Sequence, residues 1–73
     1  MSKEKINLFL LFKPKRGELY KNINGQTFVC LESFGADATM VNIDTGWRFQ
    51  AHGCRKFDDG TIEWDYSTGG YFI

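Results

Sequence analysis

Cys30, His52 and Cys54 are the residues whose types are best suited to metal binding or nucleophilic catalysis. Zinc is held by cysteine and histidine side chains, and a histidine beside a cysteine can generate a reactive thiolate. A zinc site needs several ligands in closely spaced pairs, whereas this chain has only two cysteines and one histidine. A flexible glycine also separates His52 from Cys54. We therefore expect no metal and no cofactor, with Cys30 in the core and His52 at a strand end.

Four carboxylates near the C-terminus could supply a general acid and a general base: Asp58, Asp59, Glu63 and Asp65. Glu63 and Asp65 would lie on one face of a strand, about 7 Å apart, which is a spacing found in paired catalytic carboxylates. Alternating charges are also typical of any strand with one face in water. A chain of 73 residues is short for a substantial substrate cleft. We therefore predict that the protein is not an enzyme.

A basic segment with an interleaved aromatic residue follows the N-terminal apolar run. It contains Lys13, Lys15, Arg16, Tyr20 and Lys21. Small barrels hold single-stranded nucleic acid by neutralising phosphates and stacking bases on aromatic rings. The formal net charge of the whole chain is zero, which argues against a protein that coats DNA. Nucleic-acid binding through this segment is therefore an alternative function.

From Gly17 onward, turn-forming residues separate short segments with the alternating pattern of strands. The predicted strands cover residues 18–21, 26–34, 38–43 and 47–52, followed by a loop over 53–60 and a last strand from residue 61. Asn24-Gly25 is typical of a tight hairpin turn. The segment 67–70, Ser-Thr-Gly-Gly, indicates a flexible turn that lets residues 71–73 fold back as an added strand or edge cover.

Five short strands at about ten-residue spacing are typical of a small β-barrel. A sandwich usually needs about 100 residues. The OB-fold, which is also a five-stranded barrel, often includes a helix, and no helical period is visible between Gly17 and Gly70. The sequence therefore predicts an all-β protein, with a small five-stranded SH3-like barrel over residues 17–73.

Residues 1–16 form a separate N-terminal segment in this prediction. The apolar run Ile6–Phe12 fits either a strand or a short helix, and Pro14 in the basic joint separates it from the barrel. The run is far too short to span a bilayer and is followed by no small-residue cleavage site. It either covers the barrel or forms a homodimer contact. With only two cysteines, we expect a reduced, cytoplasmic protein without a membrane partner.

The motifs at residues 17–20, 24–25 and 28–31, Gly-Glu-Leu-Tyr, Asn-Gly and Phe-Val-Cys-Leu, resemble the opening of small SH3-like domains. The later motifs, including Gly46-Trp47 and the segment Asp59–Tyr66, are similar in style to short proteins encoded by bacteriophages and mobile elements. The resemblance covers residues 17–66 and transfers no functional residue. It implies a barrel used for binding, of a kind that intercepts a host protein.

These patterns favour a non-enzymatic β-barrel that binds a macromolecule, with a protein as the preferred partner and an inhibitor or adaptor as the role. Tryptophan, tyrosine and arginine are enriched among interface hot spots. The predicted partner-binding residues are Trp47, Arg48, Glu63, Trp64, Asp65, Tyr66 and Tyr71. A third function, small-molecule binding or sequestration at a dimer seam, stays open. The sequence also leaves open whether Trp47 and Trp64 lie in the core or at an interface.

Overall fold

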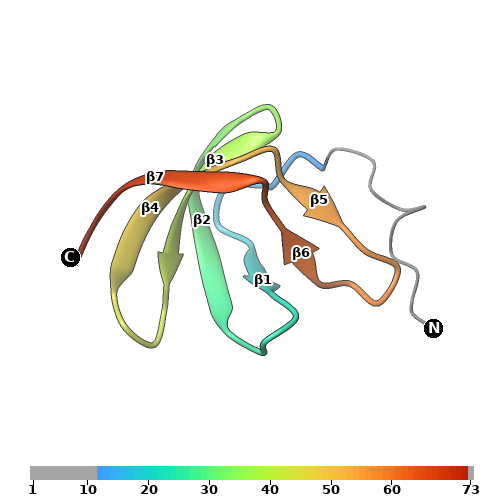
Figure 1. The fold of residues 1–73 in the computed structure, drawn as a ribbon, viewed down its shortest axis with the longest axis horizontal. Helices are drawn as coiled ribbons and strands as arrows, with labels where there is room; N and C mark the ends of the chain where they lie inside the picture. The colour runs from blue at the N-terminus through green and yellow to red at the C-terminus, as the bar shows by residue number, and fades with distance from the viewer. Residues whose placement is uncertain (1–11, 73) are drawn as a thin grey trace.

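A computed structural model describes residues 12–72, and every regular element in that range is a β-strand (Figure 1). The strands are β1 (Leu19–Lys21), β2 (Thr27–Phe34), β3 (Asp37–Asn42), β4 (Trp47–His52), β5 (Arg55–Lys56), β6 (Ile62–Glu63) and β7 (Tyr66–Phe72). β1, β2, β3, β4 and β7 form one antiparallel sheet in that order, and β5 pairs with β6 in a separate hairpin. The prediction of an all-β protein is thus confirmed.

The N-terminal apolar run lies outside the described residues except for Phe12. The backbone N–H of Phe12 donates to the carbonyl of Cys54 at 2.8 Å. Pro14 is buried, and its carbonyl accepts a hydrogen bond from Ser33 Oγ at 2.6 Å. The end of the N-terminal segment is therefore attached to the sheet. No helix with the length and apolar character to cross a membrane occurs in residues 12–72.

The first four predicted strands match β1 to β4 closely. The β1–β2 turn is closed by Asn22, whose Oδ1 accepts hydrogen bonds from the backbone N–H groups of Asn24 and Gln26 at 3.0 and 2.9 Å. Gly25 has φ of 83°, a conformation that glycine adopts without steric cost. The Asn24-Gly25 pair thus marked the hairpin correctly through the freedom of Gly25, whereas the asparagine side chain that closes the turn is that of Asn22.

The predicted loop over residues 53–60 was wrong, because it contains β5. Arg55 pairs with Glu63 and Lys56 with Ile62 across the β5–β6 hairpin. Asp59 Oδ1 accepts a hydrogen bond from the backbone N–H of Thr61 at 2.9 Å and so orders the turn. A two-residue strand gives no alternating pattern that the sequence could reveal.

The last predicted strand also differs from the structure, in two ways. The predicted strand is interrupted at Trp64 and Asp65, which lie between β6 and β7. Ile62 and Tyr66 therefore belong to different sheets. Residues 67–70 do not form a turn that folds the C-terminus back, because they lie inside β7, where Ser67 and Thr68 pair with Ala51 and Gln50 of β4.

A β-bulge accommodates the glycines of β7. Arg48 faces Tyr71 and Gln50 faces Thr68, so Phe49 lies opposite two residues, Gly69 and Gly70. Gly69 has φ of 69°, as expected for a glycine at a bulge. Gly69 and Gly70 therefore form a bulge within β7, at the position where we had predicted a turn.

The core lies between the concave face of the large sheet and the β5–β6 hairpin (Figure 1). Its buried members are Phe28, Cys30, Ala38, Met40, Phe49, Ala51, Cys54 and Ile62. Phe12, Tyr20 and Trp64 pack against this cluster and stay partly exposed. The prediction of a buried Cys30 is confirmed.

Candidate functional site

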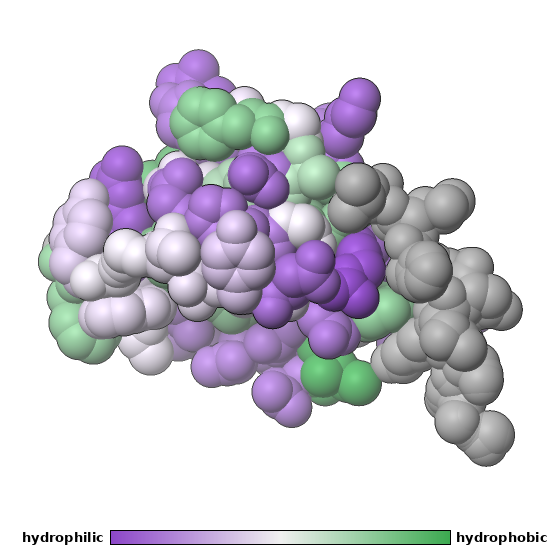
Figure 2. Space-filling view, turned by 45° about the horizontal axis from the view of Figure 1, so that its top comes forward, coloured by the Kyte–Doolittle hydropathy of each residue, from purple (hydrophilic) through white to green (hydrophobic). Residues whose placement is uncertain are grey.

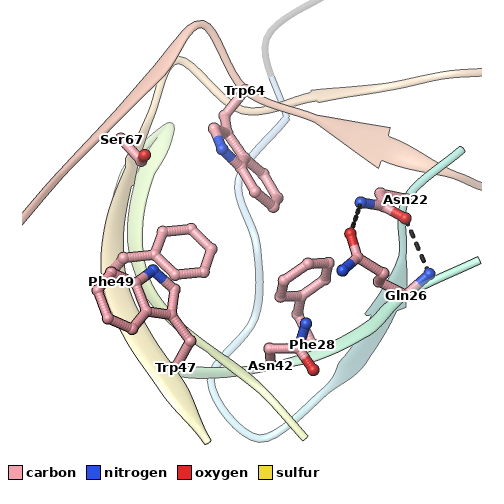
Figure 3. A pocket seen from close by; sticks show the side chains of 8 residues that line it. All are labelled: Asn22, Gln26, Phe28, Asn42, Trp47, Phe49, Trp64 and Ser67. Atoms are coloured by element: carbon pink, nitrogen blue, oxygen red, sulfur yellow. Dashed lines mark hydrogen bonds between the residues drawn. The ribbon is translucent and has the colours of Figure 1, made fainter. Parts of the chain in front are cut away.

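The predicted partner-binding residues do not form one surface. Trp47 and Trp64 line the same pocket (Figure 3). Arg48 and Tyr71 face each other across β4 and β7, with the Arg48 guanidinium carbon 5.5 Å from the centre of the Tyr71 ring. Because neighbouring residues of a strand point to opposite faces, Arg48 and Trp47 lie on different sides of the sheet. The tryptophans and the Arg48–Tyr71 pair therefore belong to separate regions.

The remaining predicted residues have contacts of their own near the hairpin. Asp65 forms an ion pair with Arg55, which also faces Glu63 across the β5–β6 hairpin. Tyr66 stacks on His52 with ring centres 4.6 Å apart and an interplanar angle of 16°. These contacts hold the segment between β6 and β7 against the end of β4.

The pocket between Trp47 and Trp64 has a volume of about 220 Å³. Its lining residues come from the β1–β2 hairpin, from β2, β3, β4 and β7, and from the segment between β6 and β7. They are Asn22, Gln26, Phe28, Asn42, Trp47, Phe49, Trp64 and Ser67. Four of these residues are aromatic and none is charged, and Figure 3 shows the rings surrounding an open space.

Three of the four aromatic rings form a packed cluster. The centre of the Phe28 ring lies 5.8 Å from that of Phe49 and 5.2 Å from that of Trp64, and both pairs meet edge to face. Phe49 and Trp64 are 5.1 Å apart. Edge-to-face contacts at these distances stabilise aromatic pairs. Trp64 thus lines the pocket with one part of its side chain and packs against the core with another.

The Trp47 ring contacts residues of β7 and is not part of this cluster. Its ring centre lies 4.8 Å from that of Phe72, and the residue is 39% exposed. The indole also crosses Gly70 so closely that a Cβ atom there would lie 2.7 Å from Cε2 and 2.8 Å from Cη2 of the ring. The absence of a side chain at Gly70 therefore makes room for the indole beside the pocket.

The amide side chains of the pocket have their oxygens occupied by local structure. Oδ1 of Asn42 accepts from the backbone N–H groups of Asp44 and Thr45 at 2.9 and 3.2 Å. Oε1 of Gln26 accepts from Nδ2 of Asn22 at 3.0 Å. These residues were not predicted from the sequence, because a glutamine or asparagine near a turn indicates only the turn itself.

A second cavity of about 250 Å³ is also lined by Trp64. It shares Asn22 and Trp64 with the first pocket and adds Ile23, Asn24, Ile62 and Glu63. Trp64 therefore lines two neighbouring cavities beside the β1–β2 hairpin.

The basic segment is divided as well. Lys15 and Tyr20 line a cavity of about 280 Å³ together with Phe12, Glu18 and Lys56. Lys56 Nζ lies 5.2 Å from the centre of the Phe12 ring, and the Tyr20 hydroxyl accepts a hydrogen bond from the Lys15 backbone at 2.8 Å. The other predicted residues of this set, Lys13, Arg16 and Lys21, are exposed and are not among its lining residues.

His52 connects three strands on the outer side of the sheet. Its Nδ1 lies 3.3 Å from Asp37 Oδ2, and its Nε2 lies 2.7 Å from the Thr68 hydroxyl. The backbone N–H of Gly53 donates to Asp37 Oδ1 at 3.1 Å, and this bond, followed by the bond with His52, lowers the pKa of the Asp37 carboxyl.

This Asp–His–hydroxyl order is that of hydrolase triads, which also need an oxyanion site and a bound substrate. Thr68 is instead exposed on an open sheet face. We therefore assign the chain of contacts through Asp37, His52 and Thr68 to the pairing of β3, β4 and β7.

The cysteines are free thiols with little nucleophilic character. Burial raises the pKa of Cys54 to about 11, with smaller contributions from the negative charges of Asp37 and Cys30. Burial also raises the pKa of Cys30. Because the thiolate is the nucleophile, both are weak nucleophiles at neutral pH. In the part of the chain from 12 to 72, no three His, Cys, Asp or Glu side chains are grouped to hold a metal ion.

The aromatic pocket between Trp47 and Trp64 is thus the arrangement best suited to binding, and its description depends on geometry alone. No protein-family model, no curated protein and no solved structure matches this chain.

Proposed function

We propose that this chain is a small, non-enzymatic SH3-like β-barrel domain that binds a protein through the pocket between Trp47 and Trp64. One observation carries the proposal: aromatic rings line an open pocket, and no residue in the 12–72 range that lines it is charged. The central parts of protein interfaces are depleted of charge and enriched in aromatic residues. Hot-spot residues tend to fill pockets that become well packed and desolvated once the partner is bound.

The surface supports a localised contact. On the face shown in Figure 2, hydrophilic residues predominate and apolar residues form separate patches. A partner would therefore gain most of its affinity by inserting one anchor side chain into the pocket, with weaker contacts around it. A role as an inhibitor or adaptor, including one encoded by a phage and directed at a host protein, fits such a contact.

The SH3-like barrel in this proposal is supported by the pattern of the sheet. Its five antiparallel strands are short, and register shifts occur in the β2–β3 pair between Cys30 and Glu32 and in the β4–β7 pair between Arg48 and Gln50. Bulges bend strands and increase their twist, which a small barrel needs at its corners.

The proposal is tested by affinity purification from nuclease-treated bacterial lysate with three forms of the protein. We expect the wild type to retain one protein in stoichiometric amount, and Trp47→Ala to lose it. Tyr71→Ala is the matched control, because it removes an exposed aromatic ring from the opposite side of the same strand pair. A partner retained by Trp47→Ala, with the variant folded, would contradict the proposed site.

Nucleic-acid binding is the second candidate, and the cavity of the basic segment favours it. Lys15 and Lys56 lie there beside the rings of Phe12 and Tyr20. If this cavity binds single-stranded nucleic acid, affinity for a labelled oligonucleotide will fall steeply with salt, because phosphate contacts release counterions. Lys15→Glu would then weaken binding, whereas Trp47→Ala would leave it unchanged.

A further inference from the structure

The pocket between Trp47 and Trp64 contains an amide donor that has no partner among residues 12–72. Asn42 is only 5% exposed and lines the pocket. Its oxygen is held by two backbone N–H groups of the β3–β4 turn, which fixes the orientation of the amide. Within residues 12–72, nothing accepts a hydrogen bond from its Nδ2, and Figure 3 shows this nitrogen on the side of the aromatic rings. Buried donors without a partner are rare in folded proteins.

Gln26 presents a second donor to the same space. Its Oε1 accepts from Asn22, so the remaining polar group of the side chain is its Nε2. In Figure 3 this nitrogen points toward the aromatic rings. Both amides therefore offer N–H groups and keep their oxygens for the turns, so the pocket is built to recognise a hydrogen-bond acceptor.

The charge and size of the pocket restrict the ligand further. Among the described residues that line the pocket, there is no lysine or arginine to neutralise a phosphate and no carboxylate to pair with a cation. The inward N–H groups also disfavour a quaternary ammonium group, which aromatic rings alone would attract. A volume of about 220 Å³ lies below the range of about 300–1,000 Å³ that is usual for whole small-molecule ligands. One neutral ring fits it best.

We propose that this pocket receives a tyrosine side chain of the protein partner, a step that rests on the proposed function. The tyrosine ring would pack among Trp47, Phe28 and Trp64. Its phenol oxygen would accept hydrogen bonds from Asn42 Nδ2 and Gln26 Nε2. Tyrosine is among the side chains enriched at hot spots, and it combines an apolar ring with a polar end.

The proposal is tested by NMR titration of the whole ¹⁵N-labelled chain with N-acetyl-tyrosinamide and, separately, with N-acetyl-phenylalaninamide. The side-chain amide signals of Asn42 and Gln26 and the indole signals of both tryptophans report on the pocket. We expect the tyrosine probe to shift these signals and to bind about tenfold more tightly than the phenylalanine probe, because a site built to bond a hydroxyl rejects the analogue without it.

An isosteric variant tests the donor. Gln26→Glu keeps an oxygen for Asn22 and replaces the inward N–H group with a second oxygen. Because a phenol hydroxyl can donate to the new oxygen, the probe for this variant is N-acetyl-O-methyl-tyrosinamide, whose ether oxygen only accepts. We expect Gln26→Glu to weaken binding of this probe by about fivefold or more, since two acceptors then face each other. Asn24→Asp is the matched control, because it makes the same change of charge in the same hairpin at a residue that does not line the pocket. Its affinity should stay within about twofold of the wild type.

Several results would overturn this inference. Equal affinity for the two amino-acid probes would remove the role of the phenol oxygen. Tighter binding of uridine or of tetramethylammonium would assign the pocket to a nucleobase or a cation. If no probe shifts the pocket signals at its solubility limit, the tyrosine proposal is wrong, while a lysate partner lost in Trp47→Ala would still support protein binding. If the pocket binds the tyrosine probe but the lysate yields no protein partner, the proposed function is contradicted and the tyrosine specificity of the pocket is not.

Discussion

The two sides of the β4–β7 pair are built from alternating residues of the same strands and have opposite properties. On the inner side, Trp47 and Phe49 pack in an aromatic environment. On the outer side, Arg48 contacts Tyr71, and His52 lies between carboxylate and hydroxyl groups. On the inner side the residues are stabilised by the packing of aromatic rings. On the outer side they are stabilised by contacts between charged and polar side chains. One step along β4 therefore changes which kind of interaction a substitution removes.

The largest expected difference between the two sides is in the free energy of unfolding. Phe28→Ala removes a buried ring that contacts both Phe49 and Trp64. Truncation of a buried phenylalanine costs about 3–5 kcal/mol, so this variant should be near the limit of stability for so small a domain. Arg48→Ala on the outer side should cost less than about 1 kcal/mol. Urea denaturation followed by tryptophan fluorescence measures both.

A milder substitution keeps that comparison measurable if the first variant does not fold. Phe28→Leu retains most of the apolar volume and should lose stability by a smaller amount than Phe28→Ala. If Phe28→Leu and Arg48→Ala destabilise the protein equally, the inner side is not more dependent on packing than the outer side.

Alkaline pH should destabilise the buried side through Cys54. The pKa of its thiol is about 11 in the folded protein, mainly because of burial, and about 8.5 in an unfolded chain. Its contribution is therefore complete below about pH 8.5 and is lost as the pH rises toward 11. The loss amounts to about 3–4 kcal/mol, since each unit of pKa difference between the folded and unfolded states equals about 1.4 kcal/mol. Unfolding of wild type and Cys54→Ala across this pH range should converge, and parallel curves would contradict it.

The bulge in β7 provides a test of the contact between the two strands. In Gly70→Ala the new methyl group would overlap the Trp47 indole, so the ring must shift from its present position beside the pocket. Overpacking of this kind costs about 1–3 kcal/mol. Denaturation and the fluorescence maximum of tryptophan measure the two effects. Gly60→Ala is a control in a turn. A Cβ there would meet nothing within 4 Å, but the φ of 89° is unfavourable for alanine, so the substitution should destabilise the protein without moving Trp47.

Much of the fold could be predicted from local chemistry. The alternating segment 47–52 and the Asn-Gly turn matched β4 and the β1–β2 hairpin, because one face of β4 is buried and because Asn22 and Gly25 suit a tight turn. The prediction failed where the deciding contact is distant in sequence. Gly70 is accommodated in a strand because Trp47 lies over it, and that contact joins residues 23 positions apart.

The candidate site was predicted only in part, for a related reason. Tryptophans are conspicuous, so Trp47 and Trp64 were identified, but their membership of one pocket depends on how β4 and the end of β6 are brought together. Asn42 and Gln26 could not be identified from the sequence. Their role in the pocket depends on which atom of each side-chain amide is hydrogen-bonded within a turn. The alternation of side chains along a strand, by contrast, is a sequence signal that places Arg48 and Trp47 on opposite faces.

The smallest expected effect is at acid pH and belongs to the outer side. The pKa of Asp37 is lowered in the folded protein, first by the N–H of Gly53 and then by His52. Its stabilising contribution is therefore present above about pH 3.9, the value for an unfolded aspartate, and is lost as the pH falls through the lower folded value. The melting temperature of Asp37→Asn should lie slightly below that of the wild type at pH 7.

This difference in melting temperature should narrow below about pH 4, because protonation makes Asp37 of the wild type as neutral as the asparagine. Thr68→Ala is the matched control: it removes the other contact of His52 without removing a carboxylate, so its difference from the wild type should not narrow in that range. A gap for Asp37→Asn that stays constant with pH would mean that the outer contacts depend on shape and not on charge. The two sides of the β4–β7 pair would then differ less than their chemistry indicates.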